Sequence, residues 1–175
     1  MIIREACIDD AVGIAKVHVD SWRTTYAGIV PDEFLANMSY DRREEQWFNE
    51  LNNPTTNRMF TYVAENDLQQ VIGFVNGGPE RNSDPIYKGE LYAIYILKHY
   101  QGQGIGYRLT KTLMERLLQA GMNSMLLWVL ADNPARHFYE ALGGQQVKKN
   151  QIEIGEVKLD EVAYGWLDIS IILQD

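Results

Sequence analysis

The sequence has little cysteine, an excess of negative over positive charge, and no long apolar run. Cys7 is its one cysteine among 175 residues, so no disulfide can form within the chain, and a reducing compartment fits. Lysine and arginine number 16 against 24 aspartates and glutamates, which gives a formal net charge of −8. Nucleic-acid binding needs a basic surface, so we expect no nucleic-acid partner. The acidic balance permits a cationic substrate, although solubility alone also accounts for it.

No apolar run approaches the length of a transmembrane helix, and no repeat or low-complexity tract occurs. The opening MIIREACIDD lacks the basic-then-apolar order of a signal peptide. We therefore expect no membrane partner, a cytoplasmic location and a single domain over residues 1–175. The three histidines and the cysteine form no cluster with metal-ligand spacing, so we also expect no metal.

Hydrophobic patterning predicts an alternation of strands and helices. Strands are predicted at residues 2–4, 59–65, 71–77, 90–97 and 125–130, with a final hairpin at about 152–159 and 161–170. Helices are predicted from Asp9 or Asp10 to about Trp22, at 32–37, from Asp41 to Leu51 with Trp47, Phe48 and Leu51 as the apolar face, from about Tyr107 to Gly121, and from Asn133 to Gly143. The segments NNPTTN and 78–89 are predicted loops.

The centre of the chain fixes the predicted fold class. A strand at 90–97 is followed by glycines, a helix and a second strand at 125–130. Two strands joined through a helix run parallel, with a right-handed crossover. Antiparallel hairpins flank this unit on both sides. The prediction is an α/β fold with a mixed, mostly antiparallel sheet that contains one parallel pair.

Residues 101–106, QGQGIG, are the feature that most directly indicates a function. Three glycines there alternate between a strand and a helix, where free backbone N–H groups meet the positive end of a helix dipole. Such a loop favours an anion, most often phosphate. The alternative is a tight turn, but one or two glycines suffice for a turn.

Spacing excludes two familiar phosphate motifs. The dinucleotide fingerprint G-x-G-x-x-G requires a final glycine at Tyr107 or Leu109, depending on where it starts. The P-loop G-x-x-x-x-G-K-S/T requires a glycine before Lys111, where Thr110 stands.

The loop and its surroundings resemble the GCN5-related N-acetyltransferases, the GNAT family. The pyrophosphate loop of that family has Arg or Gln, two residues, Gly, one residue, then Gly or Ala, and residues 101–106 match it. The strand MLLWVL follows, and then the family's second signature, from Asn133 to Tyr139. The resemblance covers about residues 1–170 in element order and is specific over 90–144. It implies a splayed parallel strand pair and transfer of an acetyl group from acetyl-CoA to a primary amine.

The resemblance also implies a coenzyme site. The N–H groups of residues 102–107 bind the pyrophosphate, and the pantetheine arm pairs with the backbone of Ile94 and Ile96, where an N–H near Ile94 or Tyr95 polarises the thioester. Asn133 contacts the pantetheine arm, and Arg136 reaches the phosphates or lies in solvent. The predicted coenzyme-binding residues are Ile94, Tyr95, Ile96, Gln101, Gly102, Gln103, Gly104, Ile105, Gly106, Tyr107, Asn133 and Arg136.

Tyr139 and Glu90 are the predicted catalytic residues. Tyr139 matches the family's general acid, and a phenol with a pKa of about 10 stays protonated and can donate to the leaving thiolate. The alternative is an aromatic residue of the core or its rim. Glu90 opens the strand that leads into the glycine loop, where relatives carry a base, and it would also attract a cationic substrate. A strand-edge carboxylate without a role is about equally expected.

Trp22 and Tyr26, in WRTTYAGIVP, are the predicted acceptor-binding aromatics, together with Glu90. For Trp22 a place in the core, at the end of the first helix's apolar stripe, is the favoured alternative. Two positions depart from the family pattern: Gln101 replaces the commoner Arg, and Gly144 stands where Phe is frequent.

Three functions remain open at this point. The first is acetylation of a small-molecule amine by direct attack in a ternary complex, the second is acetylation of protein N-termini or lysines, and the third is a non-catalytic acyl-CoA sensor. A homodimer is common in such folds, but the sequence specifies no interface.

Overall fold

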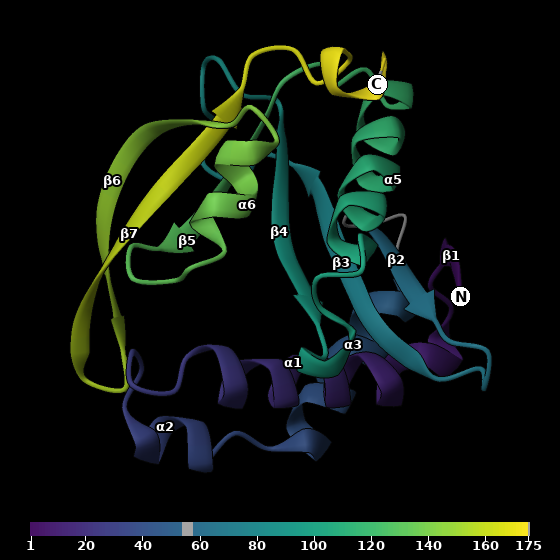
Figure 1. The fold of residues 1–175 in the computed structure, drawn as a ribbon, viewed down its shortest axis with the longest axis vertical. Coiled ribbons are helices and arrows are strands. Elements are labelled where there is room, and N and C mark those ends of the chain that lie inside the picture. Colours follow the sequence, from purple (N-terminus) through teal and green to yellow (C-terminus); the bar gives the residue numbers. More distant parts are fainter. Residues whose placement is uncertain (54–57, 175) are drawn as a thin grey trace.

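The protein is built on one mixed sheet. In the computed structural model, which describes residues 1–53 and 58–174, seven strands form a sheet in the order β1-β2-β3-β4-β5-β7-β6 (Figure 1). The strands are Ile2–Glu5 (β1), Phe60–Glu65 (β2), Val71–Pro79 (β3), Gly89–Ile96 (β4), Met125–Leu130 (β5), Gln145–Ile154 (β6) and Val157–Trp166 (β7). β4 and β5 run parallel, and the other neighbours run antiparallel. The predicted fold class is confirmed.

Helices cover both faces of the sheet (Figure 1). One face carries α1 (Ala11–Thr25), α2 (Asp32–Ala36) and α3 (Tyr40–Asn52), and the other carries α5 (Ile105–Gln119) and α6 (Arg136–Ala141). Short 3-10 turns occupy Ile8–Asp10, Lys98–Tyr100 and Ile171–Gln174. Phe74 packs with α1 and α3, whereas Leu91 packs with α5, so each face has its own hydrophobic cluster. Within the described part of the chain, no helix is both long and apolar enough to cross a membrane.

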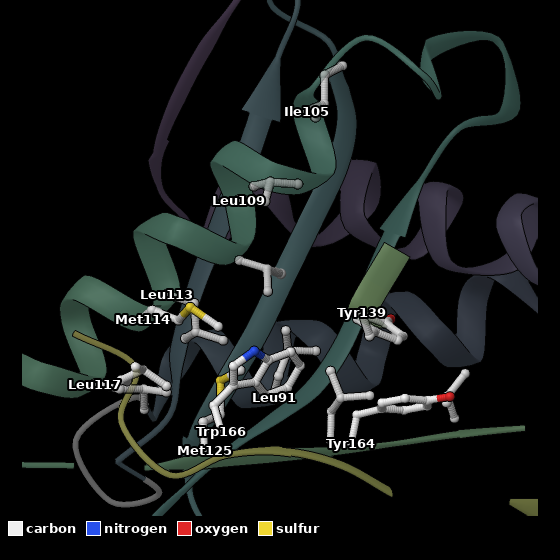
Figure 2. Packing of buried hydrophobic residues seen from close by; sticks show 14 of the residues in the cluster. Leu91, Ile105, Leu109, Leu113, Met114, Leu117, Met125, Tyr139, Tyr164 and Trp166 are labelled. Atoms are coloured by element: carbon white, nitrogen blue, oxygen red, sulfur yellow. The ribbon is translucent and has the colours of Figure 1, made fainter. Parts of the chain in front are cut away.

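The helical period of α5 anchors it on the sheet. Leu109, Leu113 and Leu117 recur every four residues and are fully buried, and Figure 2 shows their side chains pointing from the helix into the cluster that contains Leu91. Each such leucine contributes about 1.5–3 kcal/mol by burial. Gly121, with φ of 83°, follows the helix as predicted. This packing fixes the position of the amino-terminal end of α5, which carries the glycine loop.

The parallel strands pair over a short distance and then part. Residues 89–91 of β4 lie opposite residues 125–127 of β5. Beyond that point β4 continues beside β3 to Ile96, and β5 continues beside β7 to Leu130. The carboxyl-terminal halves of β4 and β5 therefore share no ladder of hydrogen bonds, and the sheet is split there.

The carboxyl-terminal hairpin was predicted several residues too late. Its strands are β6 and β7, joined by Gly155 and Glu156, which have φ of 57° and 66°. A two-residue turn with both residues in the left-handed region matches the twist of a hairpin. Glutamate rarely occupies such a turn, and β6 is exposed along nearly its whole length, so neither a turn residue nor apolar alternation marked these boundaries.

The predicted apolar face of α3 is wrong at one position. Trp47 is buried at 5% exposure, but Phe48 is 49% exposed. Successive helical residues lie about 100° apart, so two adjacent residues cannot both face the sheet centre. Most of the predicted loop NNPTTN lies outside the described residues.

Candidate active site

Two glycines of the loop at residues 101–106 have left-handed backbone conformations. The φ angle is 74° at Gly102 and 77° at Gly104, which is the residue before α5. Glycine adopts this conformation without the strain that a Cβ brings. Among the described residues, the N–H groups of Gly102, Gln103 and Gly104 donate to no backbone carbonyl, and the first turn of α5 leaves its own N–H groups free. The loop thus presents several donors at a helix N-terminus, which suits an anion.

The third glycine of the loop, Gly106, is required for packing and not for its backbone conformation. It lies inside α5 with an ordinary helical conformation, and a Cβ there would meet Ile96 Cδ1 and Phe138 Cζ, each at 3.4 Å. Glycine at this position lets the start of α5 lie close to the end of β4 and to α6. The loop's alternating glycines therefore combine two backbone requirements with one packing requirement.

The two glutamines of the loop bind its own backbone. Gln101 Nε2 donates to the carbonyl of Ile96 at 3.0 Å, and Gln103 Nε2 donates to the carbonyl of His99 at 3.1 Å. Both side chains are exposed. Gln101 thereby joins the loop to the end of β4, and the backbone amides are left as the loop's anion donors.

A cavity of about 660 Å³ runs from the glycine loop into the gap between β4 and β5. It reaches from Gly102 and Gly104 past Ile94 to Leu91, where the two strands still pair. We call it the cleft cavity. Its walls come from β4, β5, the end of α1 and the start of α6, so it lies at the split in the sheet.

Backbone groups of β4 point into this gap. The N–H of Leu97 donates to Ile72 in β3, and hydrogen-bonding direction alternates along a strand. Tyr95 therefore faces β3, whereas Ile94 and Ile96 present their N–H and C=O groups toward β5. The carbonyl of Ile96 accepts from Gln101, but the N–H of Ile96 and both backbone groups of Ile94 are available to a ligand that lies along β4, because β5 is no longer paired there.

Three polar side chains meet in the cleft cavity. Asn133 Nδ2 donates to the hydroxyl of Tyr26 at 3.4 Å, while Asn133 Oδ1 accepts from the N–H of Ala135 at 2.9 Å. Tyr139 is 6% exposed, and within the described part of the chain its hydroxyl has no hydrogen-bond partner. Burial, with a smaller contribution from Tyr26, raises the pKa of Tyr139 well above that of a free phenol. Tyr139 therefore remains a proton donor at neutral pH.

A second cavity of about 520 Å³ lies on the other face of the sheet, between α1, α3, β3 and β4. Its lining includes His18, Arg43 and Glu50. Tyr92 and Ala93 line both this second cavity and the cleft cavity. The two cavities are thus neighbours at β4, just beyond the last paired residue of the parallel strands.

Comparison with known proteins identifies the fold and the chemistry of this arrangement. A sequence model of the Acetyltransferase (GNAT) family matches residues 16–144. The chain belongs to the GNAT family. This GNAT protein is 42% identical over 168 residues to the uncharacterized N-acetyltransferase YuaI of Bacillus subtilis (strain 168), covering 96% of this chain and 94% of that protein. It is 33% identical over 106 residues to the mycothiol acetyltransferase of Rhodococcus jostii (strain RHA1), covering 59% of this chain and 32% of that protein.

Solved structures agree on the fold. The PaiA N-acetyltransferase of Thermoplasma acidophilum, in complex with coenzyme A, superposes with a TM-score of 0.73 at 24% identity, covering 91% of this chain and 96% of that one. The ribosomal-protein-alanine N-acetyltransferase of Brucella melitensis also has a TM-score of 0.73, at 20% identity, covering 95% and 99%. The predicted family is confirmed, and this GNAT protein is an acetyl-CoA-dependent N-acetyltransferase.

Glu90 lies outside both cavities of the acetyltransferase. Its side chain is 1% exposed and forms an ion pair with Arg81, with 2.5 Å between Oε1 and Nη2. Oε2 accepts from the backbone N–H of Arg81 at 3.1 Å and from its Nε at 3.2 Å. Both carboxylate oxygens of Glu90 already have donors in this conformation, which favours the alternative expectation of a carboxylate without a catalytic role.

Arg136 is turned away from the glycine loop. Its Nε donates to the hydroxyl of Tyr164 at 3.1 Å and its Nη1 to the carbonyl of Ala131 at 2.8 Å. These contacts hold α6 against β7. The prediction that Arg136 reaches the coenzyme phosphates therefore has no support in this conformation. Gln103 likewise does not line the cleft cavity.

Of two further aromatic residues predicted for the site, Tyr95 lines the cleft cavity and Trp22 does not. Trp22 packs edge-on against Tyr26, with 4.6 Å between ring centroids, and lines neither cavity. It belongs to the cluster around Leu130, which was the alternative favoured for it. Tyr95 directs its ring toward His18, at 5.0 Å, and its N–H toward β3, so Ile94 is left as the backbone donor on that stretch.

Sequence reasoning missed the second cavity altogether. Three of its side chains, Arg43, Trp47 and Glu50, lie on one face of α3 at spacings of four and three residues. That spacing was visible, but α3 reads as an ordinary amphipathic helix with a charged outer face. His18 was not among the predicted site residues, and its place beside Trp47 depends on contacts between distant segments.

Proposed function

We propose that this acetyltransferase moves the acetyl group of acetyl-CoA to the primary amine of a small molecule, by direct attack within a ternary complex. The observation that carries the proposal is that the two neighbouring cavities share Tyr92 and Ala93 in their linings. The cleft cavity would hold the coenzyme, and the second cavity the acceptor. A volume of about 520 Å³ falls in the usual range for small-molecule sites, and it favours a compact acceptor over a polypeptide.

The residues of the cleft cavity fit coenzyme A. The unpaired amides of Gly102–Gly104 and of the first turn of α5 would bind the pyrophosphate. The backbone groups of Ile94 and the N–H of Ile96 would pair with the amides of the pantetheine arm, as a neighbouring strand would. The N–H of Ile94 would stabilise the oxyanion that forms on the thioester carbonyl.

Tyr139 is the proposed general acid. As the amine nitrogen bonds to the thioester carbon, the carbon–sulfur bond breaks, and the thiolate takes the phenolic proton of Tyr139. The proton that the nitrogen loses returns to Tyr139 through water. The raised pKa of Tyr139 keeps the proton on the phenol until the thiolate forms. Asn133 and Tyr26, joined by their hydrogen bond, would position the pantetheine arm beside it.

A thiol-release assay tests this function. Acetyl-CoA would be offered with free amino acids, polyamines and aromatic amines, and separately with peptides that bear a free N-terminus or a lysine. We expect at least one class of small amine to exceed every peptide in kcat/KM. Turnover of peptides alone would contradict the small-molecule acceptor, and tight coenzyme binding with no turnover on any acceptor would identify a sensor.

A further inference from the structure

The second cavity contains a guanidinium without a protein partner. Arg43 is half-buried on α3, and among the described residues its guanidinium forms neither an ion pair within 4.0 Å nor a hydrogen bond. Burial lowers its pKa from the usual arginine value, but a guanidinium remains charged at neutral pH. A partly desolvated cation with five N–H donors favours a carboxylate, which it can bind in a bidentate manner.

His18 adds a neutral donor to the same cavity. It is 8% exposed, and its Nδ1 accepts a hydrogen bond from Trp47 Nε1 at 3.3 Å. The indole nitrogen can only donate, so Nδ1 carries no proton. Burial and Arg43 lower the pKa of His18 to about 3, so the ring is neutral and its proton lies on Nε2. That Nε2–H has no partner within the described part of the chain.

One acidic group balances these two donors. Glu50, one turn beyond Trp47, lines the cavity and has no ion pair among the described residues. Burial raises its pKa, while Arg43 and Arg81 lower it. Arg81 is already neutralised by Glu90 and stacks on the ring of Tyr92 at 4.2 Å. Among the described residues, the cavity therefore presents one cation without an acidic partner, one neutral N–H donor and one carboxylate without a cation, and the exposed Gln46 also lines it.

We propose that the acceptor is a small zwitterion of the α-amino acid class, whose carboxylate binds Arg43 and the Nε2–H of His18 and whose ammonium group is attracted by Glu50. This inference rests on the proposed function, because it takes the second cavity as the acceptor site. A zwitterion satisfies these three groups together. A polyamine would leave Arg43 and His18 without an acceptor, and a dianionic phosphate would be repelled by Glu50.

The test compares acceptors that differ only in the carboxylate. Each amino acid is assayed beside its carboxamide and its decarboxylated amine, with acetyl-CoA saturating. We expect kcat/KM for the acid to exceed that for the carboxamide by about tenfold or more, mainly through KM, because the site's donors would otherwise lack a charged acceptor. Equal values for acid and carboxamide would overturn the inference and leave the proposed function standing.

Two arginine variants test whether the preference for the acid over the carboxamide depends on Arg43. Arg43→Gln should remove the preference for the acid by raising its KM, with little change for the carboxamide. Arg42→Gln is the matched control, because it makes the same charge change at an exposed position of α3. An unchanged acid preference in Arg43→Gln, or an equal change in both variants, would overturn the assignment. If no small amine is acetylated while peptides are, both the inference and the proposed function fail.

Discussion

The two cavities are built from different parts of the chain. The cleft cavity depends mostly on backbone groups of one continuous stretch, from Ile94 to the first turn of α5. The second cavity depends on side chains that α1, α3, β3 and β4 bring together. The first can bind a coenzyme whose phosphates and amides need only backbone partners. The second carries the charges that can distinguish one amine from another.

This difference has a physical cause. Backbone donors exist at every residue, and a site made from them needs only a permissive conformation, which glycine provides. A site made from side chains needs a particular set of charges left unpaired by the rest of the fold. Enzymes with different acceptors can therefore keep the same coenzyme site. Their acceptor sites can differ, because substitution of a few side chains changes which charges are left unpaired.

The largest expected effect tests the proposed general acid of the cleft cavity. Tyr139→Phe should lower kcat by about 10²- to 10⁴-fold, because the thiolate loses its proton donor. The dissociation constant for acetyl-CoA, measured by calorimetry, should stay nearly unchanged, because the pyrophosphate donors are backbone amides. An active Phe variant would remove Tyr139 from the mechanism.

The next effect tests the backbone part of the cleft cavity. Gly104→Val should weaken coenzyme binding by about 100-fold or more, because valine strains the left-handed conformation that aims the amides. Gly121→Val is a matched control at the other end of α5, with φ of 83° and an equally open position. Comparable loss of stability in both variants, with coenzyme binding retained only in Gly121→Val, is the expected result. Coenzyme binding that is retained in Gly104→Val would show that the loop is a turn and does not bind the pyrophosphate.

A third prediction concerns the ion pair that separates Glu90 from the cavities. Arg81→Met should lower the free energy of unfolding by about 3–5 kcal/mol, because it leaves a buried carboxylate without its cation. Glu90→Gln should lower the free energy of unfolding by less, since the Arg81 guanidinium that it leaves without a partner is largely exposed to water. Chemical denaturation measures both losses. The kcat of Glu90→Gln should stay within about threefold of the parent, since a catalytic base contributes far more; a much larger fall with intact folding would reinstate Glu90 as the base.

The smallest expected effect is the contribution of His18 to the pH dependence of the free energy of unfolding. The folded pKa of about 3 lies below the unfolded value, so the unfolded state binds the proton first. The contribution of this group is complete above about pH 6.5 and decreases as the pH falls, by about 2 kcal/mol at pH 5. His18→Gln should remove this slope, whereas His137→Gln, at an exposed histidine, should keep it. Identical slopes in the parent and His18→Gln would contradict a buried neutral imidazole.

Local signals predicted the fold and the cleft cavity well. The leucine period placed α5, and the β-branched and aromatic runs placed β4 and β5. Gly102, Gly104 and Asn133 could be identified from the sequence, because each depends only on its own backbone conformation or on a hydrogen bond to the backbone nearby. The boundaries of β6 and β7 were missed because β6 is polar and exposed, so alternation carried no information there.

Residues with distant partners were predicted less well. Glu90 and Arg136 have suitable chemistry for the roles expected of them, but Arg81 and Tyr164 already engage their side chains. The second cavity was missed for the same reason, since the state of His18 depends on a tryptophan 29 residues away. Spacing along the chain predicts the periodicity of a helix or strand. It does not predict which of its side chains will form hydrogen bonds or ion pairs with another element.

The most direct test is a crystal structure of the protein with coenzyme A and a free amino acid bound together. The account predicts the pyrophosphate on the amides of residues 102–107, and the amino acid in the second cavity with its carboxylate at hydrogen-bond distance from Arg43 and His18 Nε2. Its nitrogen should point to Tyr92 and Ala93, which line both cavities. An amino acid bound elsewhere, with the second cavity empty, would contradict the division of the site into a backbone-built coenzyme cleft and a side-chain-built acceptor cavity.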